Sequence, residues 1–235
     1  MKKAVTPGSG SRVSLTRELV LRAALTIMDE SGIETLSMRL LGTRLGVEAM
    51  SLYNHVANKD DILDGVLDLV VEEIAIPAVD ANWRSAMQER AVSAWLAFRR
   101  HPWASALMDS RPSSGPARLR YFDAMIGTLH RAGFSLELAA RAFSVLDCYV
   151  YGFGRQRLNM ASSGEKEDEK RAEAFHDIIP GESYPYLAQM AEVAMKTGYD
   201  EDADFEFGLN LILDGLERLL KSMRRRPGRE GRRRS

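Results

Sequence analysis

The residues between 48 and 59 have the composition of a surface that contacts nucleic acid. Tyr53 and His55 can each donate a hydrogen bond to a phosphate oxygen of a DNA backbone. Because no acidic side chain follows Glu48 within this run, the run can lie in a major groove without repelling phosphates. Three further side chains have the size and polarity to meet base edges or the methyl group of a thymine: Met50, Ser51 and Asn54.

Residues on either side of this run extend the surface. Arg39 is long enough to reach a guanine or a backbone phosphate. Lys59 is expected to open a helix, where its charge and the free backbone N–H groups of the first turn can hold a phosphate together. Ser37 and Met38 directly precede Arg39 and complete the set of residues expected to contact DNA.

Two short helical segments must position these side chains. The first is expected from Ser37 to Leu45 and the second from Glu48 to Asn54. Only Gly46 and Val47 join them, and Gly46 gives the backbone the freedom that a sharp corner requires, which predicts a helix-turn-helix. The apolar residues expected to face inward from the two segments are Leu40, Leu41, Leu45, Val47 and Leu52.

Longer helices are expected around this corner and through the rest of the chain. The first follows Thr16, the expected N-cap, and ends at Gly32. The next runs from about Lys59 through Ile76 and is closed by Pro77. No alternating run of β-branched residues calls for a strand, so the sequence predicts an all-α fold. Later helices are expected at residues 83–100, after Pro102, and at 115–132, 136–160 and 202–223.

The segment from Gly32-Ile33 to the ending Leu52-Tyr53-Asn54-His55-Val56-Ala57-Asn58-Lys59 resembles the DNA-binding domain of TetR-type repressors. This resemblance implies that the third helix enters the major groove and that Tyr53, His55 and Lys59 contact the DNA backbone. It further implies a ligand-responsive transcriptional regulator, a repressor released from a palindromic double-stranded DNA operator by a small organic effector. The residues that the resemblance places nearest the bases are Arg39, Ala49, Met50, Ser51 and Asn54.

The later part of the chain resembles the C-terminal domain of the tetracycline-repressor branch, at Trp83 and at residues 99–103, 133–136, 149–152, 205–209 and 214–217. In that family two long helices of each subunit form an intersubunit four-helix bundle, which implies a homodimer. Gly208 and Gly215, seven residues apart on one face of the last helix, are expected to let the backbones approach closely. Alternatively, the apolar stripe of this helix packs only inside its own subunit.

The expected organisation is therefore an N-terminal three-helix helix-turn-helix DNA-binding domain followed by a larger helical ligand-binding and dimerisation domain. The expected boundaries are a flexible arm at 1–14, the DNA-binding domain at 15–61, the larger helical domain at 62–223 and a disordered basic tail at 224–235. The arginines of the tail can add nonspecific attraction to phosphates, or they can simply be a solvated end that aids solubility.

A pocket for a small organic molecule needs apolar walls and a few polar groups. Taken singly, residues of these types belong more often to a core than to a pocket. The candidates on the central helices are Trp95, Phe98, Trp103, Leu107, Met108, Phe122, Met125, Phe143, Tyr149, Phe153 and Gln156.

Two of these candidates bear on the class of effector. In an ungapped comparison, Leu107 and Gln156 stand where the tetracycline-repressor branch places the histidine and the glutamate that help to bind the drug's chelated magnesium. Neither side chain suits a hard cation. We therefore expect an apolar or neutral organic effector rather than tetracycline, with no metal site and no cofactor.

The composition indicates where the charges of the chain lie and in which compartment we expect the protein to work. Its net charge is −1, but the seven arginines and one glutamate of residues 224–235 leave 25 basic and 32 acidic side chains in residues 1–223. The case for DNA binding is therefore local. With no run of about eighteen apolar residues and no secretory signal, we expect a cytoplasmic protein without a membrane partner. The single cysteine, Cys148, is expected to be buried.

Two rival classes of function are less favoured by the sequence. An enzyme would need a recognisable set of catalytic residues, and the chain has no nucleotide-binding glycine loop and no His-Glu-x-x-His motif. A helical module that docks another protein without binding DNA stays open, because residues 12–59 carry six basic and five acidic side chains and are nearly neutral.

Overall fold

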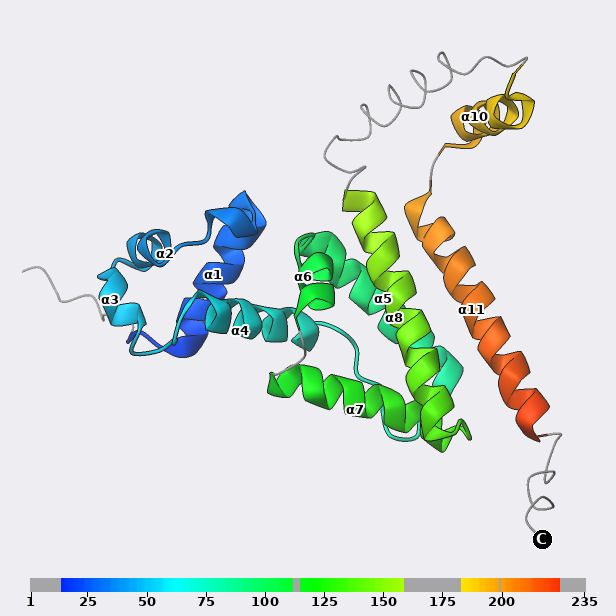
Figure 1. The fold of residues 1–235 in the computed structure, drawn as a ribbon, viewed down its shortest axis with the longest axis horizontal. Helices are drawn as coiled ribbons and strands as arrows, with labels where there is room; N and C mark the ends of the chain where they lie inside the picture. The colour runs from blue at the N-terminus through cyan, green and yellow to red at the C-terminus, as the bar shows by residue number, and fades with distance from the viewer. Residues whose placement is uncertain (1–13, 112–114, 159–182, 199, 225–235) are drawn as a thin grey trace, which may run out of the picture. The chain divides into compact units, whose positions relative to one another are not determined.

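The computed structural model describes residues 14–111, 115–158, 183–198 and 200–224, and these residues form helices with no strand among them (Figure 1). The expected all-α fold is confirmed. The basic tail from residue 225 and most of the expected N-terminal arm lie outside the described residues. No helix in the described ranges is both long enough and apolar enough to cross a membrane.

The helices divide into two compact units by their internal contacts, residues 1–68 and residues 69–235. The division falls within the fourth helix. In chain order the elements are α1 (Arg17–Ser31), the 3₁₀ turn η1 (Ile33–Thr35), α2 (Met38–Leu45), α3 (Ala49–Leu52), α4 (Lys59–Glu72), α5 (Trp83–Arg100), α6 (Ala104–Ser110), α7 (Pro116–Arg131), α8 (Leu136–Leu158), α10 (Pro185–Thr197) and α11 (Glu201–Arg224).

The first unit packs α1, α2, α3 and the start of α4 around a small apolar core. The predicted ends of α1 are confirmed, since the Thr16 Oγ1 accepts the Leu19 N–H at 3.2 Å and Gly32 leaves the helix with a φ of 82°. Leu40 was expected to face inward and does not, because its side chain is 39% exposed. The buried core residues of this unit include Val20, Leu21, Ala24, Ile27, Met28, Leu36, Leu41, Leu52, Val56, Ile62, Leu63, Val66 and Leu67.

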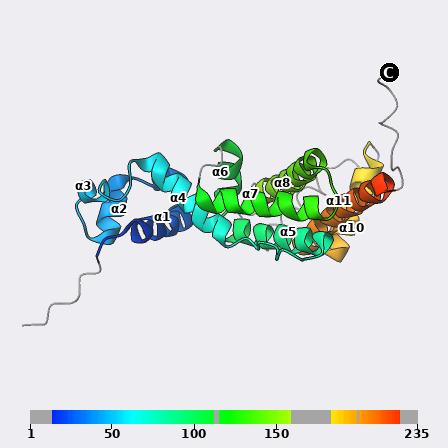
Figure 2. The ribbon, with the colours of Figure 1, turned by 90° about the horizontal axis from the view of Figure 1, so that it is seen from below.

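The second unit is organised around α8, which contacts α5, α6, α7 and α11 (Figures 1 and 2). Helix α5 spans the residues expected from the sequence, and the Asn82 side chain caps it by accepting the N–H groups of Arg84 and Ser85. The buried residues that pack these helices together include Met87, Ala91, Trp95, Phe98, Tyr121, Met125, Leu129, Phe134, Leu146, Val150, Phe205, Leu209 and Leu213.

Two expectations about helix positions were wrong. Helix α4 ends at Glu72 rather than Ile76, since its last turn tightens into i→i+3 hydrogen bonds and the Ala75 N–H donates instead to the Ser93 Oγ at 2.9 Å. Helix α10 was not predicted at all. Within this helix only Ala191 is buried.

The last helix carries two apolar stripes rather than one. Five of its residues are buried against their own subunit, namely Phe205, Leu209, Leu213, Leu216 and Leu220. Gly208 also packs inside the subunit, beneath the ring of Tyr149, whereas a Cβ added at Gly215 would have no neighbouring atom within 4 Å among the described residues. A second stripe on α11 is exposed and consists of Phe207, Leu211, Leu219 and Met223.

Cys148, on α8, was expected to be buried, but the structure leaves it exposed.

Candidate DNA-binding surface and ligand-binding core

Helix α3 buries one apolar residue and leaves the polar side chains outside. Leu52 is fully buried, whereas Met50 is 75% exposed and Tyr53 is 47% exposed. Asn54 is exposed, while Ala49, Ser51 and His55 are partly buried. The side chains singled out for DNA contact in this segment therefore share one accessible surface.

The segment after α3 continues as a tight turn rather than as regular helix. The Asn54 N–H donates to the Ser51 carbonyl at 3.3 Å, and the His55 N–H donates to the Leu52 carbonyl at 2.9 Å. These are i→i+3 bonds, which wind the backbone more tightly than an α-helix does. The α-helix is thus shorter than the expected Glu48–Asn54. The side chains expected to contact DNA nevertheless project from one continuous stretch of helix and turn.

Two glycines set the corner between α2 and α3. Gly46 adopts the left-handed conformation with a φ of 66°, as the sequence predicted, and its N–H caps the end of α2. Gly42 is a second requirement that the sequence analysis missed, because a Cβ placed there would lie 2.9 Å from the Val47 carbonyl oxygen and 3.2 Å from the Ala49 nitrogen. Only a residue without a side chain lets α2 approach the start of α3 this closely.

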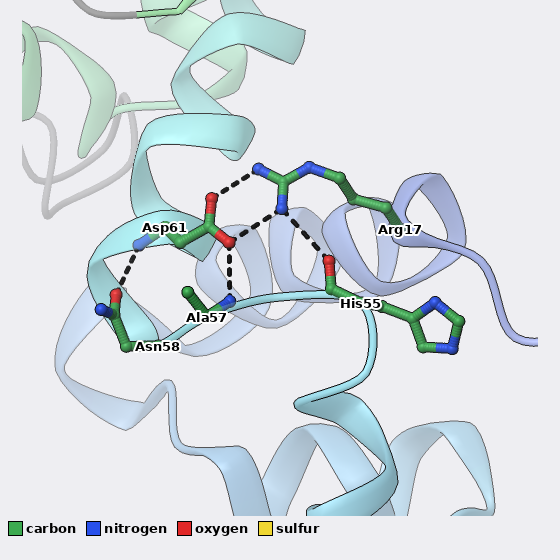
Figure 3. Close-up of polar contacts among 5 residues, drawn as sticks. All are labelled: Arg17, His55, Ala57, Asn58 and Asp61. Atoms are coloured by element: carbon green, nitrogen blue, oxygen red, sulfur yellow. Dashed lines mark hydrogen bonds and ion pairs between the residues drawn. The ribbon is translucent and has the colours of Figure 1, made fainter.

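An ion pair ties the loop between α3 and α4 to the start of α1 (Figure 3). Arg17 donates to both carboxylate oxygens of Asp61, at 2.6 and 2.8 Å, and to the His55 carbonyl at 3.2 Å. Asp61 also accepts the Ala57 N–H at 2.8 Å. The hydrogen bond from Arg17 is the main reason that the pKa of Asp61 lies below its ordinary value. This network fixes the backbone on which His55 stands.

The remaining candidates for DNA contact lie at the starts of α2 and α4. Arg39 is exposed and Met38 is partly buried, while the Ser37 Oγ caps α2 by accepting the Leu40 N–H at 3.2 Å. Lys59 is exposed at the start of α4. One N–H of that first turn is already taken, since the Asp61 N–H donates to the Asn58 Oδ1 at 2.8 Å.

The residues predicted to line a pocket separate into groups, and the first is an aromatic cluster between α5, α8 and α11. Trp95 stacks on Phe205 with ring centroids 5.3 Å apart and meets Phe153 edge-on at 5.1 Å. Tyr149 stacks on the same Phe205 ring and donates its hydroxyl hydrogen bond to the Phe205 carbonyl at 2.9 Å. The Trp95 Nε1–H donates to Asp202 at 3.1 Å. These rings are packed against one another.

The second group lies between α7 and α8. Phe122 and Phe143 meet edge-on with centroids 5.4 Å apart, and both rings lie near Tyr121. Met125, one turn further along α7, is fully buried. Phe122 and Phe143 are only partly buried, so this group reaches the surface of the unit.

The other predicted pocket residues are not brought into either group. Phe98 is buried and meets Tyr151 edge-on, with ring centroids 5.4 Å apart. The ring centroids of Trp103 and His101 are 6.1 Å apart. Leu107 is buried and Met108 partly buried on α6, whereas Gln156 is exposed on α8. No cluster of three or more His, Cys, Asp or Glu side chains that suits a metal ion occurs within the described residues.

The sequence analysis missed a buried ion pair in this unit. Arg90 on α5 is completely buried and donates to Asp147 on α8 and to the hydroxyl oxygen of Tyr121 on α7. Tyr151 donates to the same Asp147 carboxylate at 3.2 Å. Burial raises the pKa of Asp147, and Arg90 acts against that rise. The sequence did carry a signal, because Arg90 shares the helical face of the buried residues Met87, Ala91 and Ala94.

Comparison with known proteins gives a family for both units. The model of bacterial regulatory proteins of the tetR family matches residues 20–66, and the model of the tetracyclin repressor-like C-terminal domain matches residues 76–220. The chain is 32% identical over 227 residues to the HTH-type transcriptional repressor DrrR1 of Streptomyces coeruleorubidus, and the aligned region covers 93% of this chain and 83% of the relative. It is 30% identical over 213 residues to the class C tetracycline repressor protein of Escherichia coli, covering 87% and 92% of the two chains.

A solved structure agrees with these relatives. ActR of Streptomyces coelicolor, a TetR family protein determined in complex with actinorhodin, superposes with a TM-score of 0.75 at 29% identity, covering 88% of this chain and 99% of ActR. The two family models together span the helix-turn-helix and the helical unit that follows it. The chain therefore belongs to the TetR family of bacterial transcriptional regulators, a family of DNA-binding proteins rather than enzymes, with a C-terminal domain of the tetracycline-repressor type.

Proposed function

We propose that this protein is a homodimeric repressor that binds a palindromic DNA operator and leaves it when a small organic molecule enters its helical domain. The observation that carries the proposal is the accessible polar surface of α3 and the turn after it, where Met50 and Tyr53 are exposed above the buried Leu52. The surface has the dimensions of one helix, which a major groove admits. The relatives named as repressors support the direction of regulation.

In the proposed complex the side chains divide into phosphate contacts and base contacts. Tyr53, His55 and Lys59 contact phosphates, and the loop that carries His55 is already fixed by Arg17. Ser37 can still donate through its hydroxyl while its oxygen caps α2. The residues nearest the bases are Met38, Arg39, Ala49, Met50, Ser51 and Asn54.

The proposed dimer uses the second apolar stripe of α11. Phe207 is 69% exposed and Leu211 is 55% exposed, and Leu219 and Met223 continue the stripe at four-residue spacing. Apolar side chains on one helix face are usually covered by a partner. On α8, Leu136 and Val145 are also exposed. A second copy of the same chain would cover these residues and place two recognition helices for two half-sites.

Release by an effector requires that the helical domain act on the helix that carries Lys59. Glu73 directly follows α4 and accepts a hydrogen bond from Arg100 at 2.5 Å, and its other oxygen lies 3.1 Å from the His101 Nε2. The end of α4 is therefore attached to the corner between α5 and α6. A ligand that shifts this corner would favour a dimer geometry in which the two recognition helices no longer fit successive grooves.

The test of DNA binding compares three single variants on operator fragments selected from genomic DNA by the purified protein. Tyr53→Ala and Lys59→Ala remove phosphate contacts, so each should weaken binding to all sequences and Lys59→Ala should reduce the salt slope by about one. Asn54→Ala should instead change the preference among sequences. Binding should fall steeply with added salt.

The dimer and the rival function are tested with the same preparations. Leu211→Glu should yield a monomer in light scattering, while Glu206→Gln on the same helix should not. Folded wild-type protein that ignores DNA at low salt, or that binds a protein partner without salt dependence, would contradict the proposal and favour the docking module.

A further inference from the structure

The first turn of α4 combines a cation proposed to hold a phosphate with two acidic neighbours. Lys59 begins the helix, and Asp60 and Asp61 follow it directly. A carboxylate close to a DNA phosphate repels it, so a helix start that faces DNA should not leave both charges unbalanced. The structure pairs Asp61 with Arg17 of α1 (Figure 3). The charge of Asp61 is therefore balanced within the N-terminal unit.

The donors of Arg17 are committed to this pair and to the loop before α4. Its Nη1 donates to the His55 carbonyl at 3.2 Å and to the Asp61 Oδ2 at 2.8 Å, and its Nη2 donates to the Asp61 Oδ1 at 2.6 Å. A guanidinium group is planar and holds its donors in a fixed fork. The His55 carbonyl and the Asp61 carboxylate are therefore held at fixed positions relative to the start of α1.

Asp61 extends these contacts along the loop. Its Oδ2 also accepts the Ala57 N–H at 2.8 Å, and its own N–H donates to the Asn58 Oδ1 at 2.8 Å. Asn58 and Asp61 thus cap the start of α4 in the manner of a capping box. A chain of hydrogen bonds now runs from α1 through the segment that separates His55 from Lys59, the two residues proposed to contact phosphates at its ends.

We infer that Arg17 is a positioning residue for operator binding, which through Asp61 sets the spacing of His55 and Lys59 and makes no phosphate contact of its own. This inference rests on the DNA-binding role proposed above and adds a residue outside the surface that the sequence indicated. It gives α1 a part in DNA binding, because the geometry of the phosphate contacts depends on the first residue of that helix.

The charge of Asp61 makes the inference testable by the sign of one effect. Asp61→Asn removes a negative charge from the DNA-binding unit and releases the positive charge of Arg17. If long-range charge alone decided the affinity, this variant would bind DNA more tightly than the wild type. The positioning role predicts the reverse, since asparagine offers one acceptor oxygen in place of two and carries no charge to hold Arg17.

The experiment measures the affinity of the full-length protein for a fragment that the wild-type protein selects from genomic DNA, by fluorescence anisotropy at several salt concentrations. Asp61→Asn should bind at least about tenfold more weakly, the effect of a weakened hydrogen bond in each half of a dimer. The salt dependence should become shallower by at least about one, because phosphate contacts are lost. Arg17→Gln should change both quantities in the same direction.

Glu30→Gln is the matched control. The Arg44 Nη2 donates to both oxygens of Glu30, at 2.7 and 2.8 Å, so this variant also breaks an exposed ion pair between two helices of the unit and adds the same charge. It leaves the contacts of residues 55–61 in place and should bind DNA as tightly as the wild type or more tightly. Thermal unfolding establishes that each variant is folded at the temperature of the binding measurement.

Three outcomes would overturn the inference. Equal or tighter binding by Asp61→Asn, with weaker binding by Arg17→Gln, would make Arg17 a direct phosphate contact. Weaker binding by Asp61→Asn with an unchanged salt dependence would indicate only a smaller active fraction of protein. An equal loss in Glu30→Gln would show that the loop has no special part. Each of these, in a wild-type protein that binds DNA, contradicts the inference alone, whereas a folded wild-type protein that ignores DNA contradicts the proposed function as well.

Discussion

The two units use polar side chains in opposite settings. In the N-terminal unit the residues proposed to contact DNA are exposed or partly buried, and a fully buried apolar residue, Leu52, holds their segment in place. In the C-terminal unit the charged side chains of Arg90 and Asp147 are themselves part of the core and pair with each other. Surface residues can change with little effect on folding, whereas the loss of one partner of a buried ion pair leaves an uncompensated charge in the core.

The largest expected effect concerns the buried pair. Asp147→Leu leaves the Arg90 charge uncompensated in the core and should lower the free energy of unfolding by about 3–5 kcal/mol. The double variant Arg90→Met with Asp147→Leu should recover most of this loss. The measurement is urea unfolding at one fixed protein concentration. A double variant no more stable than Asp147→Leu alone would mean that the two residues are not energetically coupled. The proposed difference between an exposed polar surface in one unit and a buried ion pair in the other would then have no consequence for stability.

In the N-terminal unit a large effect is expected at the corner glycine, Gly46. Gly46→Val forces a β-branched residue into the left-handed region at a φ of 66°, and should cost at least about 1–2 kcal/mol as well as operator affinity. Gly46→Asn should cost less, since asparagine tolerates this conformation. Thermal unfolding monitored by circular dichroism compares the two. Equal losses would show that the backbone conformation is not the cause.

Substitution of Ser37 separates capping from DNA contact. Ser37→Ala removes the cap of α2 and should lower stability by about 1 kcal/mol, whereas Ser37→Asp keeps a capping oxygen and should retain stability. If Ser37 also lies against the DNA backbone, the aspartate should weaken operator binding by charge repulsion although the protein is as stable as the wild type. Unchanged operator affinity in Ser37→Asp would remove Ser37 from the interface.

The smallest expected effect is that of the exposed Arg17–Asp61 pair. Because folding lowers the pKa of Asp61, its contribution to stability is present above the ordinary value of 3.8 and is lost as the pH falls through the lower pKa of the folded state. Asp61→Asn should remove this part of the acid dependence and, with the pair partly solvated, about 1 kcal/mol or less at neutral pH. Glu18→Gln breaks the more exposed pair with Arg22 and serves as the control. Identical acid unfolding of Asp61→Asn and wild type would show that the pair is not formed in solution.

Local signals allowed much of the N-terminal unit to be predicted. The cap at Thr16 and the turn at Gly46 each depend on a few neighbouring residues, so their positions can be read from the chain, whereas the cap at Ser37 was found only in the structure. Gly42 escaped because its role depends on how closely α3 approaches α2, a distance that no local pattern encodes. Leu40 was misplaced for a related reason, since a short helix has more apolar residues than its buried face can take.

The C-terminal unit was predicted less completely. Its long helices follow from apolar periodicity, but the same pattern does not tell which rings pack together and which border a site. The candidates therefore split into the packed cluster around Phe205 and the more open group around Phe143. Helix α10 was missed although the chain carries a signal at each of its ends, Pro185 in its first turn and Gly198 at its C-cap.

The sequence by itself determined the helical class, the helix-turn-helix and the polar residues that it presents, because capping, glycine turns and apolar period are properties of neighbouring residues. Only the tertiary structure decided that Arg90 and Asp147, 57 positions apart, meet in the core, and that α11 has one stripe inside and one outside. Pairing between distant residues depends on how whole helices pack, and that packing is fixed by the sum of many weak contacts rather than by any one motif.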